Sequence, residues 1–318
     1  MVFDNGRLVE ENMDVDALRL IIADKGLHVW IDLENPTPEE SRLVLEDMFQ
    51  FHPLAIEDCI QESSLPKVDD YEDYVFLVMH AVSFNRQDLF SAIECNLFIG
   101  REFLVTYHVE PMRSISVTME KCRKMQMGIA KAPDRLVHAI LDMMVNNYNQ
   151  VLDELSLELQ EVEDNIFTVE EKDLMSSILR AKRELETLSQ TIRPQRDVIG
   201  RLGMGELKVI RSPALPYYRD IHGHLQKIDG QISSYKEQLF LTMDVYLNKV
   251  ANKTNDIIRV LTILTAVTTP IMIVGTWYGM NFDGMPELHS RSGYFTAMVV
   301  TLVSTAGIIG WMKWKKYI

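Results

Sequence analysis

The hydrophobic pattern divides the chain most sharply near its C-terminal end. Two runs without a charged residue, Val260–Trp277 and Tyr294–Met312, are 18 and 19 residues long. About 20 apolar residues in a helix cross the hydrocarbon core of a bilayer, and Trp and Tyr are enriched where such helices leave it. The pattern therefore predicts two transmembrane helices. The alternative is a pair of helices buried in a soluble core.

Basic residues around these runs predict their orientation, because cytoplasmic flanks of membrane helices are rich in Lys and Arg. The connecting segment 279–293 holds Arg291, whereas six basic residues flank the two runs on the other side: Lys249, Lys253, Arg259, Lys313, Lys315 and Lys316. We therefore expect a multi-pass protein of the cytoplasmic membrane, with both termini in the cytoplasm and a short external loop.

The first part of the chain, residues 1–133, alternates strand and helix signals. β-Branched and aromatic residues dominate HVWIDLE (28–34) and YVFLVMHAVSF (74–84), and two further runs flank Gly100-Arg101-Glu102 as in a β-hairpin. Thr37-Pro38-Glu39-Glu40 is a capping signal ahead of an apolar helical period. These signals predict a cytoplasmic α/β domain.

A helical period of 3.6 follows, and it predicts an acidic antiparallel helix pair over residues 134–212. One face is apolar, at Leu152, Leu155, Leu159 and Val162. The segment 153–173 is crowded with Asp and Glu, which could recruit divalent cations or keep neighbouring subunits apart. The alternative is an ordinary solvated helix face.

A long stalk helix is expected next. The stretch RSPALP (211–216) interrupts the helical pattern, and Pro216 suits the first turn of a new helix. Residues 213–259 form the cytoplasmic part of this helix, which we expect to continue into the first apolar run. Residues 260–318 then form the two-span membrane region, and the predicted fold class is α+β.

Composition narrows the function classes. The formal net charge of −14 over 318 residues disfavours nucleic acid as a partner and leaves cations as the likelier ligands. Three cysteines at wide spacings fit neither a disulfide framework nor a structural zinc site, and the acidic N-terminus does not resemble a signal peptide. No catalytic motif or organic-cofactor motif was found, so we do not expect an enzyme.

Polar residues recur every three or four positions along the first span and the helix before it. In lipid such a face needs a partner or water, although a threonine can also bond its own helix one turn back. We interpret the face as the lining of a water-filled pore, which two helices cannot enclose, so several identical chains are required. The pore-lining stripe is Asn248, Asn252, Asn255, Thr262, Thr265, Thr269, Met272 and Thr276.

The loop TWYGMNFDGMPELHS then lies at the outer mouth of the pore. Mg²⁺ gives up its water reluctantly, so neutral oxygens that accept hydrogen bonds from that water can hold the ion without stripping it. A ring of Gly279, Met280 and Asn281 would supply such a filter, and Asp283 and Glu287 would concentrate cations outside it.

These segments together resemble the CorA family of magnesium channels. YGMNF followed by MPEL resembles the signature loop of that family, NKTNDIIRVLTILTAVTTPIMIVGTWYGMNF resembles its stalk and pore helix, and FHPLAIEDCI with PKVDDYEDYVFLV resembles its cytoplasmic domain. The resemblance covers essentially the whole chain. It implies a homopentameric funnel in which Gly279, Met280 and Asn281 form the selectivity filter.

The resemblance also implies roles for residues outside the loop. Asn255 matches a polar ring near the cytoplasmic end of the pore, and Asp58 and Asp220 match positions that hold regulatory Mg²⁺ between neighbouring subunits. Lys313, Lys315 and Lys316 match a basic collar around the stalk. The family carries bulkier apolar residues at its pore gate than Thr269 before Pro270, so Ile258 and Leu261 are the gate candidates here.

The predicted function is therefore influx of Mg²⁺ controlled by cytoplasmic Mg²⁺, with Co²⁺ and Ni²⁺ as further candidate cations. One alternative is a zinc transporter resembling ZntB, for which His222 and His224 could be ligands. Another alternative is a membrane-anchored cytoplasmic sensor or scaffold. The expected partners are further copies of the chain, the bilayer and divalent cations.

Overall fold

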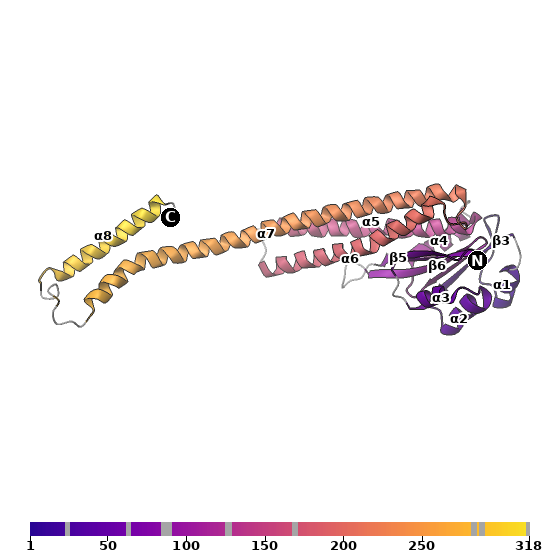
Figure 1. Ribbon diagram of the computed structural model, residues 1–318, viewed down its shortest axis with the longest axis horizontal. Helices are drawn as coiled ribbons and strands as arrows, with labels where there is room; N and C mark the ends of the chain where they lie inside the picture. Colours follow the sequence, from indigo (N-terminus) through magenta and orange to yellow (C-terminus); the bar gives the residue numbers. More distant parts are fainter. Residues whose placement is uncertain are drawn as a thin grey trace. The chain divides into compact units, whose positions relative to one another are not determined.

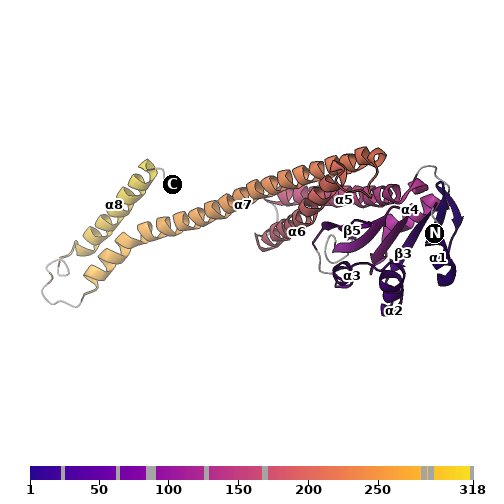
Figure 2. The ribbon, with the colours of Figure 1, turned by 45° about the vertical axis from the view of Figure 1, so that its right-hand side comes forward.

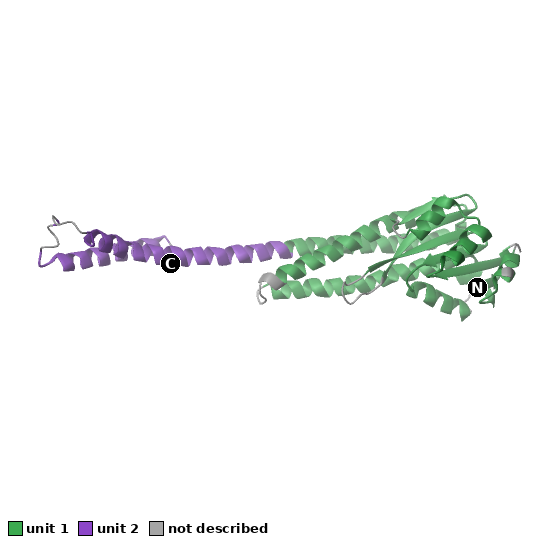
Figure 3. Cartoon of the chain, turned by 90° about the horizontal axis from the view of Figure 1, so that it is seen from below, with its two compact units in different colours: residues 1–241 green, residues 242–318 purple. Residues whose placement is uncertain are grey.

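The computed structural model describes residues 1–22, 26–61, 65–83, 91–124, 129–166, 171–280, 285 and 290–315. The chain separates into two compact units (Figure 3), an N-terminal unit of Met1–Leu241 and a C-terminal unit of Thr242–Ile318. One long helix contributes residues to both units. Each unit is described below by itself.

A seven-stranded sheet organises the N-terminal unit. Its spatial order is β2-β1-β3-β7-β6-β5-β4; the β3–β7 pair is parallel, and the other pairs are antiparallel. The predicted hairpin around Gly100-Arg101-Glu102 is confirmed as the turn between β6 and β7. The strands are β1 Val2–Asp4, β2 Arg7–Glu10, β3 Leu27–Glu34, β4 Lys67–Asp70, β5 Tyr74–Ser83, β6 Ser91–Gly100 and β7 Phe103–His108.

Helices fill most of the rest of the chain. The short ones are α1 Val15–Ile22, α2 Pro38–Arg42, the π-helix η1 Leu43–Met48, α3 Pro53–Ile60, α4 Arg113–Arg123, and the 3₁₀ turns η2 Ile129–Lys131 and η3 Ser212–Ala214. The long ones are α5 Pro133–Asn165, α6 Glu171–Met204, α7 Leu215–Tyr278 and α8 Gly293–Trp314.

The start of α2 confirms the capping signal in the sequence. The Thr37 hydroxyl accepts the Glu40 backbone N–H at 3.3 Å, and the Glu40 carboxylate accepts the Thr37 backbone N–H at 2.8 Å. Two backbone donors that the helix itself cannot satisfy are thus paired reciprocally. The helical pattern does not continue as one α-helix, because α2 passes directly into η1.

One face of the sheet is covered by α2, η1 and α3 through a cluster of aromatic and aliphatic side chains. Phe51 stacks on Phe98 with ring centroids 4.2 Å apart, and Phe76 packs against Phe98 at 4.7 Å. Leu45, Ala55 and Cys59 complete the cluster from the helical side and are fully buried. This packing fixes α3, and with it Asp58, against the sheet.

The other face is covered by α5 and α6 (Figures 1 and 2), and polar bonds tie these two helices to the strands. The Tyr148 hydroxyl of α5 donates to the His80 carbonyl of β5 at 2.7 Å and accepts from the Gln195 amide of α6 at 2.8 Å. Both helices are therefore locked to one strand, and the predicted antiparallel helix pair is confirmed.

The first part of α7 is attached to the same pair. Buried Asp134, at the start of α5, accepts hydrogen bonds from the Arg211 guanidinium at 2.6 and 2.9 Å, and its backbone carbonyl accepts the Tyr218 hydroxyl at 2.6 Å. Pro216 lies in the first turn of α7, as predicted, and the helix continues unbroken through Pro270 to Tyr278.

The C-terminal unit contains the second part of α7, residues 242–278, and α8. Both helices are long and apolar enough to cross a membrane. A helix pairs most of its backbone N–H and C=O groups internally, as hydrocarbon surroundings require, although Pro270 has no N–H to donate to the carbonyl one turn earlier.

Candidate functional site

The polar stripe lies on an exposed face of α7. Asn248, Asn252 and Asn255 are exposed in the single chain, and so are Thr262, Thr265, Thr269, Met272 and Thr276. By contrast, Ile263, Ala266 and Val267, which point to another side of the helix, are half-buried. The stripe is thus available to line a space between chains.

The threonine hydroxyls of the stripe are satisfied by their own helix. Thr262 donates to the Ile258 carbonyl at 2.8 Å, Thr265 to the Leu261 carbonyl at 2.8 Å, and Thr269 to the Thr265 carbonyl at 2.7 Å. Thr268, which lies off the stripe, bonds in the same way to the Leu264 carbonyl at 2.9 Å. These bonds leave the hydroxyl oxygens able to accept hydrogen bonds from water, but they do not by themselves require a pore.

The start of the candidate filter is built on the end of α7. The Gly279 N–H donates to the Gly275 carbonyl at 3.0 Å, and the Met280 N–H donates to the Trp277 carbonyl at 3.4 Å. A Cβ placed on Gly279 would lie 2.9 Å from the Gly275 carbonyl oxygen, so a side chain there would displace backbone. Asn281, Asp283 and Glu287 lie outside the described residues.

The gate candidates and the basic collar are placed only in part. Ile258 and Leu261 are exposed on α7, on the side of the membrane span that is expected to face the cytoplasm. Lys313 lies in the last turn of α8. Lys315 follows that helix, and its Nζ lies over the Trp314 ring, 5.5 Å from the ring centroid. Lys316 lies outside the described residues.

Asp58, a predicted regulatory ligand, is paired with a cation of its own chain. The Lys67 ammonium, at the start of β4, donates to the Asp58 carboxylate and to the Asp69 carboxylate, the latter at 3.2 Å. Burial opposes the charge of Lys67, but the hydrogen bonds to Asp58 and Asp69 outweigh it and raise the pKa of the ammonium above its usual value. The sequence analysis missed Lys67, although it stands in the quoted segment PKVDDYEDYVFLV.

Asp220, the other predicted regulatory ligand, lies on the first part of α7 with its carboxylate 70% exposed. The carboxylate lies near His224, one turn later on the helix, with 3.9 Å between the imidazole Nε2 and the Asp220 carboxylate oxygen. His224 is itself partly exposed, and it is one of the two histidines, with His222, that the zinc alternative invoked. Asp220 is therefore open to a ligand from outside the chain.

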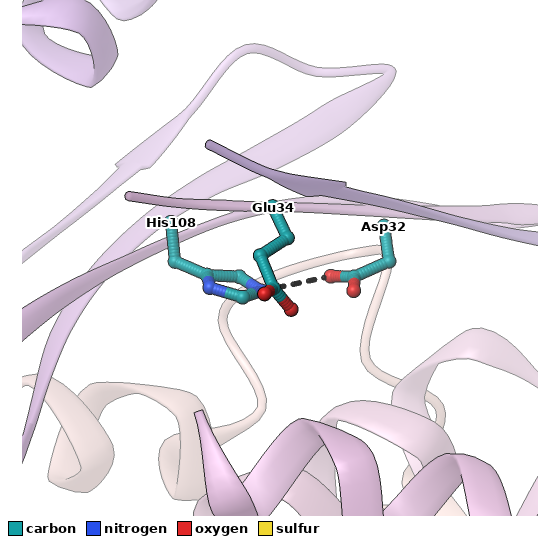
Figure 4. A group of neighbouring side chains, drawn as sticks. All are labelled: Asp32, Glu34 and His108. Carbon is teal, nitrogen blue, oxygen red and sulfur yellow. Dashed lines mark hydrogen bonds and ion pairs between the residues drawn. The ribbon is translucent and has the colours of Figure 1, made fainter. Parts of the chain in front are cut away.

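A further group of possible metal ligands was not foreseen. Asp32, Glu34 and His108 each offer one ligand atom, and these atoms all lie within 4.8 Å of one another (Figure 4). The imidazole Nε2 of buried His108 lies 3.2 Å from the Asp32 carboxylate. Burial alone would lower the pKa of His108, but the hydrogen bond and charge of Asp32 raise it.

Sequence reasoning missed this group because it depends on strand pairing. Asp32 and Glu34 belong to β3, and His108 ends β7; the parallel register sets Glu34 beside His108 and Asp32 beside Thr106. Alternate positions of a strand face the same side, so the polar residues of HVWIDLE and FLVTYHV were the available signal. The pairing of two strands so far apart in sequence was not predictable from those patterns.

The fold and these sites define a class: a membrane protein with a large α/β unit, a long helix entering the membrane and a short loop between two spans. The chain matches the CorA-like Mg²⁺ transporter protein family over residues 26–315. It therefore belongs to the CorA-like Mg²⁺ transporter family, whose members are transporters of the membrane.

Matches to individual relatives extend along nearly the whole length of this chain. YfjQ of Bacillus subtilis is 32% identical over 287 residues, covering 90% of this chain and 88% of the relative. The cobalt/magnesium transport protein CorA of Thermotoga maritima is 28% identical to this chain, and the match covers 96% of this chain and 87% of the relative. The solved CorA magnesium transporter of Methanocaldococcus jannaschii shares the fold, with a TM-score of 0.79, 22% identity and 92% of each chain covered.

Proposed function

We propose that this chain assembles as a homopentamer and carries Mg²⁺ into the cytoplasm through a pore lined by α7. The family match over residues 26–315, with a Gly-Met-Asn loop between two membrane helices, is the observation that carries the proposal. The exposed stripe from Asn248 to Thr276 supports it, because in a ring of chains this face would border water. The membrane potential would drive entry, since two charges gain about 4.6 kcal/mol per 100 mV.

In this proposal Gly279, Met280 and Asn281 form the filter, with Asp283 and Glu287 at its rim. The glycine is supported by the close approach of the Gly275 carbonyl, which leaves no room for a side chain. Asn281 would face the hydrated ion with its amide oxygen. Ile258 and Leu261 would form the apolar constriction below, and Lys313, Lys315 and Lys316 would form the collar.

The test is Mg²⁺ flux into proteoliposomes that contain the purified protein. Asn281→Ala should abolish uptake, whereas Asn149→Ala, at an exposed asparagine of α5, should leave it unchanged. Undiminished Mg²⁺ flux in Asn281→Ala would contradict the assignment of Asn281 to the selectivity filter. A panel of Mg²⁺, Co²⁺, Ni²⁺ and Zn²⁺ in the same assay decides the cation, and absence of any flux would favour the anchored sensor.

Regulation follows from the carboxylates on the N-terminal unit. Asp58 of one chain and Asp220 of the next would bind cytoplasmic Mg²⁺ and hold the ring closed, because a ligand stabilises the state that it binds better. Asp220→Ala should weaken inhibition of flux by Mg²⁺ on the cytoplasmic side. An inhibition curve identical to that of the unsubstituted protein would contradict this role of Asp220.

A further inference from the structure

The group formed by Asp32, Glu34 and His108 lies where a ligand site is favoured by the strand arrangement. β3 and β7 form the parallel pair of the sheet, and all three residues stand at the carboxyl ends of these strands. Ligands of α/β folds gather at this end of parallel strands, because side chains and strand-end backbone converge there. Figure 4 shows the three side chains projecting from the same side of the strands.

The imidazole of His108 is held in an orientation suited to metal binding. Its Nδ1 lies 2.7 Å from the Glu110 carbonyl oxygen, which can only accept, so Nδ1 carries the proton. Nε2 then points toward the carboxylates of Asp32 and Glu34. A backbone carbonyl that fixes the far nitrogen in this way is the usual companion of a metal-binding histidine.

The Asp32 carboxylate is also held from outside the group. It accepts the Thr106 hydroxyl, whose oxygen in turn accepts the Trp30 indole N–H at 3.0 Å. Trp30, Thr106 and His108 are all buried, so this chain of bonds fixes two of the three ligand atoms before any ion arrives. Such preorganisation reduces the entropy lost on binding.

The distances fit one small cation. Ligand atoms bound tetrahedrally at about 2.1 Å lie roughly 3.4 Å apart, and the His108 Nε2–Asp32 Oδ1 distance is already 3.2 Å. Glu34 is exposed, and its flexible side chain needs only to rotate inward from within 4.8 Å. Because Glu34 is on the solvent side, the ion has an entry path and retains water at the remaining position.

The ligand types select the class of cation. Mg²⁺ prefers oxygen ligands only, whereas one imidazole with two carboxylates suits Zn²⁺, Co²⁺ and their neighbours. Two carboxylates also balance the charge of a dication in a half-buried position. We propose that Asp32, Glu34 and His108 form a binding site for a transition-metal dication of the Zn²⁺ and Co²⁺ class in the N-terminal unit. This site is separate from the filter and from the Asp58 and Asp220 positions.

The test uses Co²⁺ as the probe on the purified full-length protein, with its affinity tag removed and excess Mg²⁺ present to fill oxygen-only sites. Nitrogen-bound Co²⁺ of low coordination number gives intense visible absorption, whereas hydrated Co²⁺ absorbs weakly. The unsubstituted protein should show this absorption, and Glu34→Gln should weaken Co²⁺ binding at least about tenfold. Asp32→Asn and His108→Gln should act in the same direction.

Matched controls separate this site from the rest of the chain. Glu39→Gln, at an exposed acid of α2, and His224→Gln, beside Asp220, should leave the absorption unchanged. Asn281→Ala should also retain it, so the result does not depend on the filter assignment. Absence of the absorption in the unsubstituted protein would overturn the proposal. Unchanged Co²⁺ affinity in Glu34→Gln would overturn it too. Because Glu34 is exposed, this second test stands even where His108→Gln fails to fold.

Discussion

The two units of the chain bury their apolar residues in opposite ways. In the N-terminal unit Phe98, Leu97 and Tyr148 are fully covered by other parts of the same unit. In the C-terminal unit Leu264 and Leu302 are exposed in the single chain, and only 6% of the most apolar 18-residue stretch of each helix is buried. Contiguous apolar surface on this scale is not stable in water. The first unit therefore owes its fold to its own contacts, and the second needs surroundings other than water, such as lipid.

Polar bonds show the same contrast. In the N-terminal unit some hydroxyls bond their own helix, as Thr118 does, but others join residues far apart in sequence, as Tyr148 joins His80 and Gln195. The threonines of α7 bond carbonyls three or four residues back in the same helix. Bonds of the first kind specify a tertiary structure, whereas bonds of the second kind only make a hydroxyl tolerable in lipid.

The largest effect should come from removing one phenylalanine ring from each unit in turn and comparing the two losses of stability. Phe98→Ala removes a ring that stacks on Phe51 and packs on Phe76, and it should cost about 3–5 kcal/mol of unfolding free energy. Phe295→Ala, at an exposed ring of α8, should change that free energy by less than about 0.5 kcal/mol. Denaturant unfolding followed by circular dichroism in detergent measures both. Equal losses would erase the contrast between the units.

A charge placed on two similarly exposed leucines should sharpen the comparison further. Leu302 of α8 is 63% exposed and Leu20 of α1 is 76% exposed. Leu302→Arg should raise the free energy of membrane insertion by about 3 kcal/mol, because the arginine meets hydrocarbon, whereas Leu20→Arg meets water. Resistance of the protein to alkaline extraction from membranes reports insertion. Full retention of Leu302→Arg would show that this face of α8 is not in lipid.

The fold was largely predictable where one local signal determines an element. Uncharged length predicted the membrane helices, β-branched runs predicted β3 and β5, and Thr37 with Glu40 predicted the start of α2. The short strands β1, β2 and β4 were missed, since three or four residues carry too little periodicity. The parallel pairing of β3 with β7 was missed because no local pattern encodes contacts between distant segments.

The candidate sites divide in the same way. The filter loop and the stripe on α7 follow from contiguous sequence, so they could be proposed without coordinates. The Lys67–Asp58 pair and the group around His108 arise only when separate elements meet, and they became visible only in the structure. The division of the chain into domains at 1–133, 134–212, 213–259 and 260–318 stays a prediction.

A substitution of Lys67 should change the proposed regulation by the N-terminal unit without changing permeation through the C-terminal unit. If Asp58 binds Mg²⁺ as proposed, the Lys67 ammonium competes with the ion for the Asp58 carboxylate, so Lys67→Met should lower the half-inhibiting Mg²⁺ concentration about tenfold, equivalent to ~1.4 kcal/mol. Maximal flux should not change. Lys124→Met, which removes an exposed pair with Glu120, is the control and should leave the inhibition curve unchanged. The Mg²⁺ inhibition curve is measured in proteoliposomes. If Lys67→Met does not shift it, this competition is excluded.

The smallest effect compares two threonine hydroxyls. The Thr37 hydroxyl satisfies a backbone N–H that α2 leaves without a helical partner, so Thr37→Ala should cost about 1 kcal/mol of unfolding free energy. The Thr265 hydroxyl bonds the Leu261 carbonyl inside its own helix, so Thr265→Ala should cost close to nothing in stability. If Thr265 faces water in a pore, the same substitution should still alter Mg²⁺ flux. Flux and stability both unchanged in Thr265→Ala would mean that the hydroxyl serves only its own helix, and the pore interpretation of the stripe would lose that residue.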